Sequence, residues 1–306
     1  MVRRFLPLLL LPVLLPGASD WVRVRTTDGT IVEGAAQTRS VKLAQVLSIS
    51  NGAPATDAEA ARITAGLAAI QGTDRAARDK AVDELTAIGL PVMTPLLKAY
   101  KDTDQHEPRP LYRLFERIMP SYADDFDRTK SLTRMASGEA VRGPMPTGSI
   151  EVNGVSMDWS KVRSLAVRQK SVKRTMEVHS LKHSTQIEYL DTGVVLTSAS
   201  KATLAAKGLV RLSWETDSWA SDANGLKVPG SPAYKSNLVD GQPFGALVAR
   251  VEPAGEMLFV GKSGAVSGKA GRLRLAVNDN AHWQNNLGTF SVTMTATDAY
   301  DMGDAQ

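Results

Sequence analysis

The protein has 306 residues, a length that allows two or three domains. Its composition is that of an ordinary globular protein, and a net charge of +4 is too small for a dedicated nucleic-acid binder. The chain contains no cysteine, which excludes disulfides, thiol catalysis and thiolate metal sites.

Residues 1–19 have the features of a secretory signal peptide. Arg3 and Arg4 precede a short apolar run that ends at Pro16, and the small residues Gly17, Ala18 and Ser19 follow. The apolar run is shorter than the ~20 residues of a membrane-spanning helix and contains three prolines. We therefore expect an exported protein, periplasmic or extracellular, with no transmembrane segment after cleavage.

Two stretches predict a small β module in two parts, residues 20–52 and 136–183. The first contains "WVRVRTTDGTIVEG" (21–34), in which apolar strand residues flank an Asp-Gly turn. The second contains "SIEVNGVSMDWSKVRSLAV" (149–167), which repeats the arrangement around Asn-Gly. We interpret them as two copies of one unit. The basic stretch 161–174 alternates charges with Val and Leu, which favours a solvated strand face.

A helical segment is predicted over residues 53–135, between the two parts of the module. Thr56 and Glu59 have capping-box spacing and begin a helix that ends at Gly72. Further helices are expected over 73–89, 90–102 and 108–126. The string "ARDKAVDELTAIGLPVMTPLLKAYKD" (77–102) resembles one HEAT-type repeat. A single repeat cannot bury its own apolar face, so these helices must pack on one another or on the module.

Residues 184–306 predict an all-β domain. Six strand-like runs are separated by Gly, Pro, Asn and Asp, and "GTFSVTMTAT" (288–297) alternates apolar and hydroxyl side chains. The spacing favours a jelly-roll β-sandwich. The fold class is thus multi-domain α+β, with a helical HEAT-like segment inserted in a small β module and a C-terminal jelly roll.

Catalytic motifs are absent from the sequence: it has no phosphate-binding glycine loop, nucleophile elbow, paired zinc ligands on a helix or EF-hand loop. His179 and His183 are four residues apart among strand-like residues. That spacing separates them by about 13 Å in a strand, so we expect no metal site there. These observations predict a non-enzymatic protein.

The polar segment between the last two predicted strands, "NDNAHWQNN" (278–286), is the candidate site. Asp279 ends one strand, and Asn285 and Asn286 precede the next. Calcium takes about six to eight oxygen ligands, and carboxylate and amide oxygens are among those it prefers. The alternative is that these residues only form a turn, because Asn and Asp hydrogen-bond their own backbone.

The region from about 187 to 298 resembles the galactose-binding PA-IL-type lectins of bacteria, which are calcium-dependent β-sandwiches. The matching elements are "DTGV" (191–194), "AAKGLVRLS" (205–213), "GALVARV" (245–251), "VGKSG" (260–264) and above all "AVND" (276–279) with "NNLGTFSV" (285–292). The resemblance implies that Asp279, Asn285 and Asn286 bind calcium through side chains and that sugar hydroxyls join the same ion. It also implies backbone ligands near Leu212 and His282.

The sequence departs from this family inside the site. The loop is one residue shorter, Ala281, His282 and Trp283 replace the family's Pro-Gly-Thr, and its galactose-contacting loop has no match within 226–244. Galactose specificity is therefore not carried over. His282 and Trp283 are candidate ligand-binding residues, with Trp283 either a stacking platform for a sugar or a plug that fills the pocket. Trp214 and Trp219 either wall the same pocket or pack in the core.

Taken together, the sequence predicts an exported binding protein that recognises a carbohydrate or envelope polyol with the help of calcium. The alternative is a cell-envelope scaffold whose lectin-like domain has lost its ligand. In either case the helical segment is a candidate surface for a protein partner.

Overall fold

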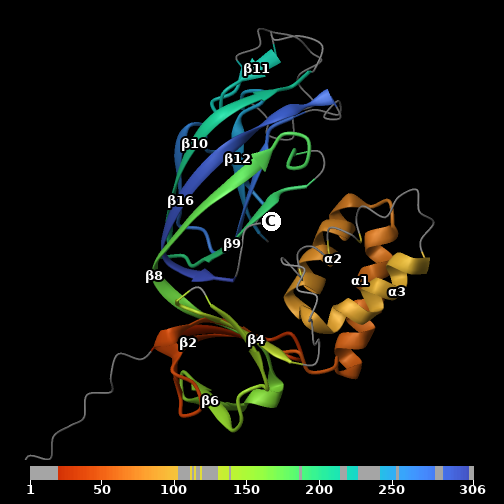
Figure 1. Cartoon of the computed structure of the whole chain (residues 1–306), viewed down its shortest axis with the longest axis vertical. Helices are drawn as coiled ribbons and strands as arrows, with labels where there is room; N and C mark the ends of the chain where they lie inside the picture. Colours follow the sequence, from red (N-terminus) through yellow and green to blue (C-terminus); the bar gives the residue numbers. More distant parts are fainter. Residues whose placement is uncertain are drawn as a thin grey trace, which may run out of the picture.

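The protein is mostly β, with a large curled antiparallel sheet and, among the elements that lie wholly within the described residues, three α-helices (Figure 1). The computed structural model describes residues 20–102, 111, 114, 118, 130–137, 139–185, 188–213, 219–226, 242–252, 255–279 and 285–302. The predicted signal peptide, 1–19, lies outside them. Within these ranges, no helix combines the length and hydropathy needed to cross a membrane.

The first copy of the small β module begins with a hairpin. β1 (Asp20–Thr26) pairs with β2 (Ile31–Thr38), and the predicted Asp-Gly turn joins them, with Gly29 at φ +94°. The Asp28 carboxylate accepts hydrogen bonds from the Thr26 hydroxyl and the Thr30 amide, which lower its pKa to about 2. The 3-10 helix η1 (Leu43–Gln45) and β3 (Val46–Ser50) complete this copy.

The second copy repeats that order of elements. β6 (Ser149–Val152) and β7 (Val155–Asp158) flank a two-residue turn in which Asn153 and Gly154 both have positive φ, as a type I′ hairpin requires. The 3-10 helix η3 (Trp159–Lys161) and the long strand β8 (Val162–His179) follow. β4 (Ser131–Met135) and β5 (Ala140–Gly143) extend the sheet from β3.

Both copies contribute to one core. β8 lies between β1 and β3, and β2 pairs with β6, so the two copies share a single sheet. Their buried apolar residues form one cluster: Val22, Val24, Ala36, Leu43, Val46, Ile49, Ile150, Val152, Trp159, Val162, Leu165 and Val167. Neither copy has a core of its own, which explains why they occur as a pair.

The helices have the boundaries that their capping residues predict. α1 (Asp57–Gln71) has a capping box at Thr56 and Glu59, and α2 (Arg75–Ile88) ends at Gly89, whose φ is +75°. η2 (Leu90–Val92) and α3 (Met93–Asp102) follow. The predicted helix 108–126 lies largely outside the described residues, but Leu111, Leu114 and Ile118 are helical and pack with the other three helices.

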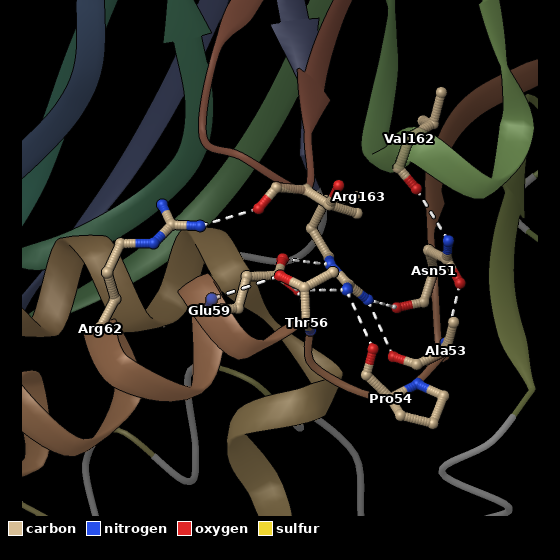
Figure 2. Close-up of polar contacts among 9 residues, drawn as sticks. Asn51, Ala53, Pro54, Thr56, Glu59, Arg62, Val162 and Arg163 are labelled. Carbon is tan, nitrogen blue, oxygen red and sulfur yellow. Dashed lines mark hydrogen bonds and ion pairs between the residues drawn. The ribbon is translucent and has the colours of Figure 1, made fainter.

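A buried ion pair joins α1 to β8 (Figure 2). Arg163 Nε and Nη2 donate to the two Glu59 carboxylate oxygens at 2.7 and 2.6 Å, and the side chains are 2% and 1% exposed. The remaining donors of Arg163 reach the backbone oxygens of Asn51, Ala53 and Pro54 at 3.3, 2.9 and 3.3 Å. Each of the five N–H groups of the guanidinium therefore has an acceptor.

This network corrects the interpretation of residues 161–174 as a solvated strand face. Arg163 is buried under α1, and Arg174 forms an ion pair with Asp301. Lys161, Lys170 and Lys173 are exposed, as predicted. The periodicity locates a strand, but the sequence does not show that a helix 104 positions away covers one end of it.

The C-terminal β unit, residues 168–302, is built on the long strand β16 (Leu287–Asp301). β16 pairs with the second half of β8 and, as far as Thr297, with β10 (Lys201–Arg211). At Asp298, whose φ is +50°, the strand turns, and Tyr300 and Asp301 pair with β9 (Leu190–Leu196) instead. The turn carries β16 from one half of the curled sheet to the other.

The remaining strands widen these two halves. β11 (Ala220–Ser221) and β14 (Ser263–Ser267) pair with β10. β15 (Gly271–Val277) pairs with β9, followed outward by β12 (Leu247–Glu252) and β13 (Met257–Phe259). Inward-facing residues of both halves form one core, and Phe290, Val292, Met294 and Ala296 of β16 lie in it, which confirms the predicted alternation. The finer assignment as a jelly-roll sandwich stays an interpretation.

β8 belongs to both β units. Its residues 162–167 pair with β1, whereas its residues 168–179 pair with β16. Val172, Met176 and Val178 lie in the core of the C-terminal unit. The domain boundary at residue 184 is the prediction of the sequence, and the pairing of this strand leads us to expect a boundary near residue 168 instead.

We expect a fragment of residues 184–306 to be unfolded and a fragment of residues 168–306 to fold. The shorter one loses three buried apolar side chains, each worth about 1.5–3 kcal/mol, and leaves one edge of β16 unpaired. That loss is large against a total stability of about 5–15 kcal/mol. Circular dichroism with thermal melting decides between them, and a cooperative melt of the shorter fragment would contradict the prediction.

Candidate functional site

The candidate site lies where β15 ends and β16 begins. Asp279 follows β15 by two residues, and Asn285 and Asn286 directly precede β16; residues 280–284 lie outside the described part. The structure brings two of the three predicted ligands into contact, because Asn286 Nδ2 donates a hydrogen bond to the Asp279 carboxylate. Asp279 is 1% exposed and Asn286 is 2% exposed.

The segment after β8 holds both residues in place. Asn286 Nδ2 also donates to Ser180 O at 3.1 Å. Thr185 binds the backbone of Asp279 from both sides: Asp279 N donates to Thr185 Oγ1 at 3.0 Å, and Thr185 Oγ1 donates to Asp279 O at 3.1 Å. Val277 N donates to His183 O at 2.8 Å. Sequence reasoning missed Ser180 and Thr185, whose role depends on a contact between segments about a hundred positions apart.

One oxygen of the site is buried without a hydrogen bond. Asn286 uses its amide nitrogen twice, but its Oδ1 has no hydrogen-bond partner and is inaccessible to solvent. Native proteins satisfy most buried polar atoms, so such an oxygen points to a missing partner that is a cation or a donor. An amide oxygen beside a carboxylate is a donor set that suits calcium, a hard cation.

Asn285 and Leu212 lie next to this pair. Asn285 is half-buried. Arg211 pairs with Leu287 in the β10–β16 ladder, which places Leu212 opposite Asn286. Gly245, at φ +76°, also packs closely here, since a Cβ at this position would lie 2.7 Å from Leu212 Cδ1. The proposed backbone ligand at Leu212 is therefore near the site.

The other predicted residues are distributed as follows. His282, Trp283 and Trp214 lie outside the described residues, so the choice between a stacking platform and a plug stays open. Trp219 packs against the core and meets Phe244 edge to face, with ring centroids 6.1 Å apart. Of its two predicted roles, the structure supports packing.

The two histidines of "HSLKH" (179–183) require a correction. β8 ends at His179, and His183 N donates to His179 O at 2.7 Å, so the segment is a helical turn and not a strand. The imidazole centroids are 5.8 Å apart and not 13 Å. His183 Nδ1 accepts from His179 N at 3.1 Å, which occupies that nitrogen. The turn positions Ser180 and Thr185 at the candidate site.

Across the described ranges, no three His, Asp or Glu side chains lie close enough together to hold a metal ion. This finding concerns sites rich in carboxylates and imidazoles. The set formed by Asp279, Asn285 and Asn286 has a single carboxylate and is of a different kind.

Comparison with known proteins finds likenesses among solved structures. No protein-family model matches the sequence, and no curated protein matches it. The chain is similar to a solved structure described as "EclA N-terminal domain; PllA-like lectin", with 21% sequence identity and a TM-score of 0.29. The match covers 41% of this chain and 96% of that chain. The HEAT-type resemblance of the helical segment stays a prediction.

Proposed function

We propose that the protein is a non-enzymatic binding protein whose C-terminal β unit recognises a carbohydrate or polyol with the help of calcium. The observation that carries the proposal is the buried contact between Asp279 and Asn286, in which Asn286 Oδ1 has no hydrogen bond. The "ND…NNLG" pattern that resembles the PA-IL-type lectins adds support, because it assigns calcium to the same residues.

In this proposal Asp279, Asn285 and Asn286 hold the ion, with backbone oxygens near Leu212 and His282. Calcium, when bound, would offer open coordination positions to sugar hydroxyls. The chain's own contribution is to orient the ligands: Thr185 fixes the backbone of Asp279, and Ser180 fixes the amide of Asn286. This orientation exists before any ion binds, which lowers the entropy that binding must offset.

A second candidate is an envelope scaffold in which the site has lost its ion. The hydrogen bond from Asn286 to Asp279 favours this candidate, because the amide N–H already stabilises the Asp279 carboxylate without a cation. Calcium titration followed by a glycan array with and without chelator separates the two. A heat of calcium binding together with glycan binding that a chelator abolishes supports the calcium-dependent binding protein. The absence of both supports the scaffold.

We further propose export, from Arg3, Arg4 and the apolar run that follows them. Expression in a bacterium with a periplasm should yield a mature chain that starts near Ser19 or Asp20. N-terminal sequencing or intact mass of the fractionated protein measures this directly. An intact Met1 in the cytosolic fraction would contradict it.

A further inference from the structure

Two carboxyl groups meet on one buried guanidinium where the helices contact the C-terminal β unit. Arg274, on β15, is 3% exposed, and its Nη2 donates a hydrogen bond to Asp83 of α2. Its Nε lies 2.6 Å from Oε2 of Glu252, on the neighbouring strand β12, whose side chain is 9% exposed. The contact therefore joins α2 to the C-terminal β unit across 191 positions of the sequence.

The geometry at Arg274 differs from that at Arg163, which uses the same two nitrogens. Arg163 Nε and Nη2 donate to the two oxygens of one carboxylate, that of Glu59, as a guanidinium fork usually does (Figure 2). At Arg274 the fork faces oxygens of two different carboxyl groups, one from α2 and one from β12. Two carboxyl groups thus occupy a position that normally binds one.

Glu252 does not complete its contact with this fork. Its Oε2 and Arg274 Nε are both buried without a hydrogen bond although they are 2.6 Å apart, and Arg250 Nε is 3.9 Å from its Oε1. Two adjacent buried carboxyl groups are stabilised when one of them is protonated, because its O–H then donates to the other. Burial and the contact with Asp83 raise the pKa of Glu252 to about 7, against the opposing effect of Arg274 and Arg250.

The other charged groups around Arg274 keep its guanidinium protonated. Burial lowers the pKa of Arg274, but four carboxyl groups outweigh this effect and raise it: Asp191, Asp83, Glu252 and Glu188. Asp191 also forms an ion pair with Arg272 Nε at 2.9 Å. The proton that this cluster gains or loses is therefore the one between the two carboxyl groups of the fork.

We propose that Asp83, Glu252 and Arg274 form a pH-sensitive latch between α2 and the C-terminal β unit. When one proton is shared, Glu252 donates to the Asp83 carboxylate, which in turn accepts from Arg274. When both groups are ionised, two adjacent negative charges compete for one fork, and the contact weakens. The helices then depend more on their attachment to the small β module through Glu59 and Arg163.

The direction of the pH dependence follows from the shift. The ordinary pKa of the Glu252 carboxyl is 4.5, and in the folded protein it is about 7. The folded state therefore binds the proton more tightly, so the latch contributes its full stability below pH 4.5 and loses it as the pH rises through 7. A shift of this size allows a change of up to about 300-fold in the equilibrium between the closed and the open latch.

Hydrogen–deuterium exchange of the full chain at about pH 5.5 and about pH 8.5 tests the proposal. Glu252→Gln keeps the shape of the side chain and a donor for Asp83 but cannot ionise, so it mimics the protonated group. Comparing two proteins at the same pH removes the intrinsic pH dependence of exchange. In peptides of α2 we expect equal rates at the lower pH, and at the higher pH a wild type that exchanges at least about tenfold faster than Glu252→Gln.

Two further variants make the result decisive. Asp83→Asn removes one of the two charges, so its exchange rates relative to Glu252→Gln should be the same at both pH values. Glu177→Gln removes an exposed carboxylate of β8 and is the matched control, which should behave as the wild type does. Equal rates for the wild type and Glu252→Gln at both pH values would overturn the proposal. Faster exchange of Glu252→Gln at both would also overturn it, because Glu252 would then be a permanent ion-pair partner of Arg274.

Discussion

Replacing Arg163 by alanine should lower the free energy of unfolding by about 3–5 kcal/mol, the usual result of breaking a buried ion pair from one side. The change leaves the Glu59 carboxylate buried without its main partner, and it also leaves the backbone oxygens of Ala53 and Pro54 without a donor. Glu59→Ala should lower the free energy of unfolding by a similar amount, since it leaves the Arg163 guanidinium buried without its carboxylate partner and removes the capping box of α1. Urea denaturation followed by circular dichroism measures both.

The double variant Glu59→Leu/Arg163→Met distinguishes the mechanism. Because an apolar pair leaves no uncompensated charge, it should recover much of the stability lost in either single variant. Arg23→Ala is the control: its ion pair with Glu33 is about one-third exposed and should contribute no more than about 1 kcal/mol. Single variants that stay within 1 kcal/mol of the wild type would show that the network does not anchor the helices.

The second large effect concerns calcium. If the site binds calcium, millimolar calcium should raise the melting temperature of the wild type, and Asp279→Asn should abolish that rise because it removes the only formal charge among the proposed side-chain ligands. The fold should change little, since Asn is isosteric and the bonds from Thr185 reach only the backbone of residue 279. Asn285→Ala should weaken binding less, because water can replace one neutral oxygen.

Isothermal titration and thermal melts with and without chelator measure these differences. Asp298→Asn is the matched control: it removes an exposed carboxylate from the other end of β16, where Asn tolerates the positive φ. It should bind calcium as the wild type does. If the wild-type protein shows neither a heat of calcium binding nor a shift in melting temperature, the segment 278–286 does not bind calcium and is only a turn.

Local patterns predict local structure well in this chain. The Asp-Gly turn, the capping box of Thr56 and Glu59, and the alternation of β16 depend on neighbours within a few positions, and all three are present. The pairing of Arg163 with Glu59 and the clamp of Thr185 on Asp279 depend on contacts across 104 and 94 positions. A single sequence carries no signal for such contacts.

The error at "HSLKH" has a related cause. Ser180, Leu181 and Lys182 do not terminate a strand by their propensities. The alternating pattern of the sequence therefore predicts that the strand continues through them. The strand ends because Ser180 makes hydrogen bonds at the candidate site instead of continuing the ladder. Its N–H donates to Gly288 O at 3.1 Å, and its carbonyl oxygen accepts from Asn286 Nδ2. The sequence therefore predicted which residues belong to the candidate site. It did not predict how they are positioned, because that depends on contacts with a distant segment.

β8 fixes a distance as well as a fold. The strand leaves the core of the small β module at Val167 and reaches the candidate site at His179, twelve residues further on. At about 3.3 Å per residue, this separates the two by roughly 40 Å. Because the connection is a paired strand and not a linker, it acts as a rigid spacer. A surface that binds the helices or the small β module would therefore hold the candidate site at one fixed distance and in one orientation.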